Sequence, residues 1–159
     1  MTTTDETADD LTERSAEQDA EWLAWRKGGV TASDVARCHT GRYGGSPMAI
    51  VAEKLGIAEP TEVTDAMTRG LRLEVPITAA VANLRGHHVG YTQAWLQHAD
   101  RPTHRATIDG VLLPHADAEI GEMLGIVEIK TTGQHVPSAW DYYEAQTQRQ
   151  MHVADADVA

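Results

Sequence analysis

The sequence HRATIDGVLLPHADAEIGEMLGIVEIKT, residues 104–131, decides the fold. Its two ends, 104–113 and 122–131, are rich in β-branched and other apolar residues and have the length of strands. The polar segment 114–120 separates these two runs, which indicates a hairpin. Residues 88–97, HVGYTQAWLQ, give a third strand-like run. We therefore expect three antiparallel neighbours in chain order.

The last of these strands carries the sequence Glu128-Ile129-Lys130. Alternate residues of a strand share a face, so the carboxylate and the ammonium group point the same way, and the carbonyl of Ile129 lies near them. Asp109, followed by Gly110, lies in the preceding strand and can meet Glu128 across the hairpin. Two carboxylates and a carbonyl suit Mg²⁺ or Mn²⁺, and a lysine beside such a metal can position and help deprotonate a water.

Each half of this pattern also has an ordinary structural interpretation. A Glu-X-Lys sequence on a strand is commonly a charge pair on a solvated face, and Asp-Gly is a turn signal. The two halves become informative because a hairpin joins them in order. At this point the residues alone leave both interpretations open.

Helices precede and follow these strands. Apolar spacing and cap residues predict helices over about 10–27, from near Thr31 or Ser33, over 47–55, 65–85 and 138–152. Pro76 should kink the 65–85 helix or begin a new segment. Residues 155–159 resemble the start of another strand. We therefore expect an α/β (α+β mixed) core, a central mixed sheet flanked by helices, with its C-terminal strands truncated.

The length of 159 residues suits one domain. We expect a disordered acidic tail over residues 1–9 and a single domain over 10–159. No apolar run has the roughly 20 residues that span a bilayer, and no secretory signal begins the chain, so we expect no membrane association. A single cysteine, Cys38, excludes an intramolecular disulfide and fits a reducing cytoplasm.

The net charge of −11 argues against a nucleic-acid partner. Its distribution weakens that objection, because residues 1–21 hold eight acidic side chains and one basic one. Residues 22–110 hold ten basic and eight acidic side chains, a net charge of +2. An acidic tail can stay solvated away from a DNA path, so the charge does not exclude a DNA partner.

Over about residues 22–153, the sequence resembles the lambda exonuclease or YqaJ-type viral recombinase nucleases of the PD-(D/E)XK superfamily. The resemblance rests on separated blocks that follow the family's order. They are WLAWRKGGVTASDV from Trp22 to Val35, Arg69-Gly70 with Glu74, ATIDG ending in Asp109-Gly110, Glu128-Ile129-Lys130, and YEAQTQ from Tyr143 to Gln148. The family's Ser-Pro before the aspartate is replaced by Thr107-Ile108, which removes no metal ligand.

The resemblance implies a role for each matching residue. Asp109 and Glu128 would bind Mg²⁺ (Mn²⁺ as a substitute) with the carbonyl of Ile129. Lys130 would orient the attacking water. The other implied positions are Glu74 at metal-linked water or a second metal, Gln146 as a hydrogen-bond donor near the lysine or the water, and Arg26 with Ser33 at the 5′ phosphate of the DNA end.

The implied function is a magnesium-dependent exonuclease that degrades duplex DNA from 5′ ends in phage-type recombination. The resemblance also implies a single-strand annealing protein as partner and a homo-oligomer, a trimer, in a bacterial host cytoplasm. One alternative is an endonuclease or repair nuclease with the same metal site and no grip on the 5′ phosphate. Another is a catalytically silent module that binds DNA ends.

Overall fold

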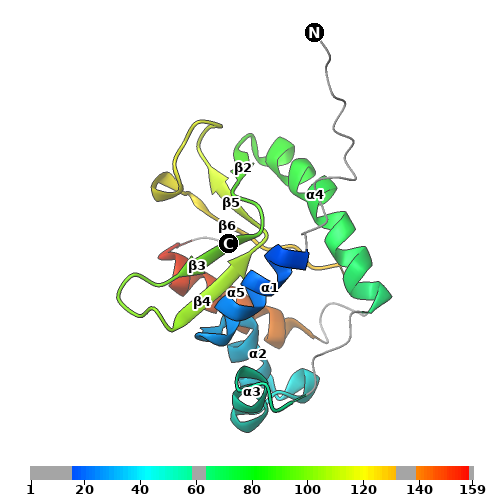
Figure 1. Cartoon of the computed structure of the whole chain (residues 1–159). Helices are drawn as coiled ribbons and strands as arrows, with labels where there is room; N and C mark the ends of the chain where they lie inside the picture. The colour runs from blue at the N-terminus through cyan, green and yellow to red at the C-terminus, as the bar shows by residue number, and fades with distance from the viewer. Residues whose placement is uncertain (1–15, 59–63, 132–138, 158–159) are drawn as a thin grey trace.

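The computed structural model describes residues 16–58, 64–131 and 139–157 (Figure 1). The expected disordered tail, residues 1–9, lies outside this part of the chain. The helices are α1 (Ala16–Lys27), α2 (Ala32–Thr40), α3 (Pro47–Lys54), α4 (Asp65–Arg85) and α5 (Trp140–Ala154), with short 3₁₀ turns at Arg42–Gly44 and Ile120–Glu122. The strands are β1 (Val30–Thr31), β2 (His88–Gly90), β3 (Ala94–Gln97), β4 (His104–Ile108), β5 (Gly110–Leu113) and β6 (Gly125–Val127).

Short polar residues begin α2, α3 and α4, as their cap signals predict. The Thr31 side chain accepts a hydrogen bond from the backbone N–H of Asp34, and the Asp34 carboxylate accepts one from the N–H of Thr31, which makes a capping box. Ser46 and Thr64 each accept a hydrogen bond from an N–H in the first turn of the next helix.

Two three-stranded sheets stand at the centre, with the strand orders β1-β4-β3 and β2-β5-β6. Strand β3 runs antiparallel to β4, and β5 runs antiparallel to both β2 and β6, so the expected order of neighbours is confirmed. Strand β1 pairs in parallel with β4 and makes the first sheet mixed. Strand β1 has only two residues, Val30–Thr31, so the sequence shows no alternation of apolar and polar residues that would predict it.

The expected central sheet is present as two small sheets, because both strands of the first hairpin, residues 88–97 and 104–113, break at the same level. The 104–113 run is interrupted at Asp109, which separates β4 from β5. Gly90 pairs with Val111 and Ala94 with Ile108, so residues 91–93 face only 109–110. One extra residue on one strand bends the pair, as in a β-bulge. The bend divides the sheet and places Asp109 at the junction.

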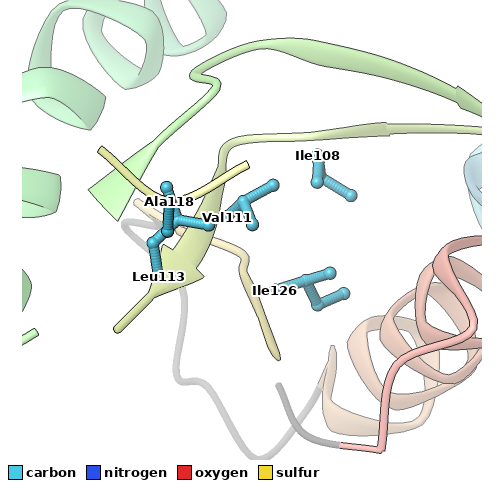
Figure 2. Close-up of a cluster of buried hydrophobic side chains, with 5 residues drawn as sticks. All are labelled: Ile108, Val111, Leu113, Ala118 and Ile126. Carbon is cyan, nitrogen blue, oxygen red and sulfur yellow. The ribbon is translucent and has the colours of Figure 1, made fainter. Parts of the chain in front are cut away.

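A cluster of buried apolar side chains fills the space beside this junction. Its buried members are Ile108, Val111, Leu113, Ala118 and Ile126 (Figure 2). Partly buried side chains of β3, of the 3₁₀ turn at 120–122 and of the C-terminal end of α5 pack against them. A smaller cluster joins α2 to β4 and α5 through Ala32, Ala106 and Val153. The two clusters anchor α5 against strands of both sheets.

Helix α4 is continuous from Asp65 to Arg85, so the expected new segment at Pro76 is wrong. Pro76 and Arg72 are both exposed, and water can therefore satisfy the Arg72 carbonyl that loses its helical partner. The strand expected from residue 155 is also wrong over 155–157, because Asp155 adopts a left-handed conformation that ends α5. None of the described helices combines the length and apolarity that a membrane span requires.

Candidate active site

The junction between the two sheets brings Asp109 next to Glu128. Asp109 immediately precedes β5, Glu128 immediately follows β6, and the pairing of Gly110 with Val127 aligns them across adjacent strands. The Asp109 Oδ2 atom accepts a hydrogen bond of 2.6 Å from the backbone N–H of Ile129. This bond fixes one carboxylate oxygen of Asp109 and leaves the other available for a ligand.

Three side chains hold the carboxylate of Glu128. Gln146 Nε2 donates to Oε1 and Gln150 Nε2 donates to Oε2, each at 2.6 Å. The ammonium group of Lys130 forms an ion pair with Oε1. Glu128 and Lys130 therefore share a face of the chain, as the Glu-X-Lys spacing predicts. The two glutamines lie one helical turn apart on α5 and fix the plane of the carboxylate.

The charged groups at this junction shift one another's pKa. Burial raises the pKa of Asp109 and of Glu128 above the ordinary carboxyl range, and the Asp109 carboxylate raises the pKa of Glu128 further. Lys130 opposes both shifts. Burial alone would lower the pKa of Lys130, but the neighbouring Glu128 carboxylate outweighs it and raises that pKa. Two buried carboxylates that repel each other favour an added cation.

The donor chemistry at this junction fits a hard divalent cation. Mg²⁺ is commonly held by one or two carboxylates and keeps several waters. Asp109 and Glu128 offer two carboxylates, and Ile129 lies between Glu128 and Lys130 in the chain. Across residues 16–58, 64–131 and 139–157, no three His, Cys, Asp or Glu side chains converge to hold a metal. Glu74 therefore does not complete a three-carboxylate set here.

Glu74 comes to the same region from α4. Its Oε2 atom accepts a hydrogen bond of 2.5 Å from Nε2 of Gln93, a residue at the bend of the first hairpin. The backbone N–H of Gln93 in turn donates to the carbonyl of Asp109 at 3.4 Å. Gln93 thus connects the carboxylate from α4 with the strand that carries Asp109.

A second polar cluster forms where α1 meets α2, and it contains Arg26 and Ser33. Arg26 Nη2 donates to Ser33 Oγ at 3.1 Å, and the guanidinium group lies 4.7 Å from the ring centre of Trp22. Ser33 Oγ also lies 3.1 Å from Thr31 Oγ1. The structure therefore brings Arg26 and Ser33 together at the start of α2, a helix end that suits an anion.

A buried carboxylate, Asp34, supports this second cluster. It is 2% exposed and pairs with Lys54 Nζ at 2.6 Å, while Arg26 Nη2 lies 4.0 Å away. Burial would raise the pKa of Asp34, but hydrogen bonds from Lys54 and Thr31 together lower it below its usual value. Lys54 Nζ also donates to the carbonyl of Arg26 at 2.8 Å. Asp34 and Lys54 thus fix the end of α1 that carries Arg26.

Tyr142, on the first turn of α5, lies within electrostatic range of both clusters. It is 9% exposed, and burial raises its pKa, whereas Lys130, Arg37 and Arg26 lower it. The same coupling raises the pKa of Lys130 and opposes the lowering of the Arg26 pKa, which burial causes. Charged groups of both the Arg26 cluster and the Asp109–Glu128 junction therefore lie near enough to Tyr142 to shift its pKa.

Sequence reasoning missed several of these contacts. Gln150 lies four residues after Gln146, a spacing that places both on one face of a helix and could have identified it. Asp34 follows Thr31 at capping-box spacing, which indicates the cap but not the ion pair. Lys54 and Gln93 are far in sequence from the residues they contact, and no local signal indicates their roles.

Replacing Gln150 with methionine should lower the free energy of unfolding by about 1–3 kcal/mol. Gln150 is fully buried, and its Nε2 also donates to the carbonyl of Thr107 at 2.9 Å, so the change leaves two buried acceptors short of a donor. Thermal and urea unfolding measure the loss. Gln148→Met on the exposed side of α5 is the matched control, and equal stability of the two variants would contradict the role given to Gln150.

Comparison with known proteins gives a matching family model and similar solved structures. The model of the YqaJ-like viral recombinase domain matches residues 21–157. A crystal structure of LHK-Exo in complex with dAMP is similar at 27% identity and a TM-score of 0.63, covering 86% of this chain and 69% of that one. Another, of an alkaline exonuclease (LHK-Exo) from Laribacter hongkongensis, is similar at 26% identity and a TM-score of 0.62, with the same coverage. No curated protein gives a significant match.

These matches bear out the fold class expected from the sequence. The mixed α+β arrangement, with two small sheets and flanking helices, is similar to the fold of the alkaline exonuclease and consistent with a PD-(D/E)XK-like core. The family model spans both the Arg26 cluster and the Asp109–Glu128 junction.

Proposed function

Because this chain belongs to the YqaJ-like viral recombinase domain family, we propose that it is a metal-dependent deoxyribonuclease that degrades duplex DNA from 5′ ends. The observation that carries the proposal is the presence of two clusters of different chemistry, the Asp109–Glu128 junction with Lys130 and the Arg26–Ser33 pair. One cluster pairs carboxylates with a lysine, and the other presents an arginine and a serine at a helix start. An exonuclease needs both, because it must hold an end and cut beside it.

At the first cluster, Asp109 and Glu128 would hold Mg²⁺, or Mn²⁺ in its place, together with the carbonyl of Ile129. A bound cation would supply Lewis-acid stabilisation of the scissile phosphate and lower the pKa of the attacking water. Lys130 would orient that water through its ammonium group and stabilise the negative charge that develops. Gln146 contributes by fixing the Glu128 carboxylate through its hydrogen bond to Oε1.

At the second cluster, Arg26 and Ser33 would bind the terminal 5′ phosphate. The contact with Ser33 and the ring of Trp22 restrict the guanidinium group before DNA arrives. An ordered arginine loses less conformational entropy when it binds phosphate. Fixing the end in this way would convert binding energy into orientation of the scissile bond.

The wider setting belongs to the same proposal. The chain would act in phage-type recombination in a bacterial cytoplasm, which suits its single cysteine. Its product, a resected DNA end, would load a single-strand annealing protein. A homotrimer would match the ring that the resemblance implies.

The test is incubation of 5′-phosphorylated linear duplex with and without Mg²⁺, beside a closed circle of the same sequence. We expect the linear DNA to be consumed only with Mg²⁺, with early release of nucleotides labelled at the 5′ end, and the circle to persist. Cleavage of the circle would support an endonuclease instead. Binding of linear DNA without its consumption would support a silent end-binding module.

A further inference from the structure

The bend in the first hairpin carries backbone strain at two residues that are not glycine. Tyr91 has φ of 50° and Gln93 has φ of 55°, both in the left-handed region. For ordinary side chains this conformation costs roughly 1–2 kcal/mol per residue. Strained backbone that persists in a fold is often associated with a functional constraint. Gln93 is the more informative of the two because of what its side chain contacts.

Gln93 bonds both to Asp109, at the sheet junction, and to Glu74, on α4. Its backbone N–H donates to the carbonyl of Asp109 at 3.4 Å, and its side-chain amide donates to Glu74 Oε2 at 2.5 Å. The left-handed backbone lets Gln93 form both hydrogen bonds, because the extra residue in the bend turns its side chain from the strand toward α4. Tyr91, by contrast, is 46% exposed, and no described hydrogen bond of its side chain reaches the site.

Helix α4 depends on such a contact for its placement. Thr78 is the one α4 side chain that the described structure buries, while Met67, Leu73, Val75 and Leu84 are exposed. A helix with so little buried surface has its position set weakly by packing. The hydrogen bond from Gln93 to Glu74 therefore helps to fix this carboxylate relative to Asp109.

We propose that Gln93 is a positioning residue that holds Glu74 toward the Asp109–Glu128 pair, and that the strained bend is retained for this purpose. The inference rests on the proposed metal site and assigns a role that the family resemblance does not give. Gln93 itself touches neither DNA nor the cation. It acts through the Glu74 carboxylate, so its loss should reduce affinity for the divalent cation.

The test is Gln93→Gly with Tyr91→Gly as the matched control. Both changes relieve a positive φ, so both variants should keep or gain thermal stability. Only Gln93→Gly removes the bond to Glu74. We expect it to weaken Mn²⁺ binding to the DNA-free protein by about 5- to 20-fold, measured by calorimetry, and to raise the Mg²⁺ concentration needed for half-maximal cleavage. Tyr91→Gly should bind Mn²⁺ as the parent does.

A double-mutant cycle identifies the route of the effect. In a Glu74→Gln background, Gln93→Gly should have little further influence on Mn²⁺ affinity, because the carboxylate it positions is already gone. Three results would each overturn the inference. Gln93→Gly could lower Mn²⁺ affinity as much in the Glu74→Gln background as in the parent. The two glycine variants could bind Mn²⁺ equally well, or the parent could bind no Mn²⁺. Failure of the parent to cut any DNA while the Mn²⁺ pattern holds would overturn only the proposed nuclease function.

Discussion

Replacing Lys130 with alanine is expected to slow magnesium-dependent DNA cleavage by about 10²–10³-fold, the usual effect of removing a positioned donor that stabilises developing charge. The ammonium group forms an ion pair with Glu128, and the side chain is 34% exposed, so its truncation leaves no large cavity. The protein should therefore remain folded. Single-turnover rates at saturating Mg²⁺ measure the loss, and circular dichroism checks the fold.

The two carboxylates should behave differently from the lysine. Asp109→Ala and Glu128→Ala should also abolish cleavage, but mainly by weakening metal binding, whereas Lys130→Ala should act mainly on turnover. Calcium should support DNA binding and support cleavage poorly, because its looser coordination positions a water less well. Full activity of Lys130→Ala in Mg²⁺ would contradict the proposed catalytic centre.

The second large effect is expected at the DNA end. Arg26→Ala should slow digestion of 5′-phosphorylated ends by about 10- to 100-fold, because hydrogen bonds to a charged phosphate contribute roughly 1.5–3 kcal/mol. Ends without the phosphate should already be slow, and the change should affect them little. Arg26→Lys should restore only part of the rate, since lysine keeps the charge but loses the planar fork.

Lys27→Ala is the matched control for Arg26, because the neighbouring lysine is exposed on the same turn of α1. It should leave the preference for phosphorylated ends intact at physiological salt, where exposed charges are screened over roughly 8–10 Å. Equal rates on phosphorylated and unphosphorylated ends in the parent protein would remove the 5′ anchor. That result would not affect the metal site, which the Lys130→Ala variant tests separately.

The elements that sequence predicted well are those with local signals. Thr31 and Ser46 indicate where their helices begin, because their short side chains cap the first turn. The patterns of residues 104–113 and 122–131 predict a hairpin, although only Gly125–Val127 of the second run is a strand. The adjacency of Asp109 and Glu128 follows from that hairpin, because register in a short antiparallel pair is set by the loop.

The features that sequence did not predict depend on contacts between distant residues. The pattern of residues 104–113 predicts one strand that runs through Asp109 and Gly110. The extra residue that breaks this strand belongs to 91–93 on the partner strand, so the pattern of 104–113 does not show the break. Strand β1 forms because β4 offers an unpaired edge for backbone hydrogen bonds. Its two residues need no strand-like sequence pattern for this pairing. Lys54 pairs with Asp34 across two helices, and such ion pairs have no sequence period.

The glutamines of α5 also determine the order in which the candidate centre can be assembled. Both carboxylates are synthesised before Gln146 and Gln150, the residues that hold Glu128 in place. Until α5 docks, Glu128 lacks the two amides that fix its orientation. Gln146 and Gln150 lie 18 and 22 residues after Glu128, so these hydrogen bonds form only once α5 has been synthesised. A nascent chain ending before Trp140 would therefore carry Asp109, Glu128 and Lys130 without the helix that organises them, which would keep an unfinished chain from acting on DNA.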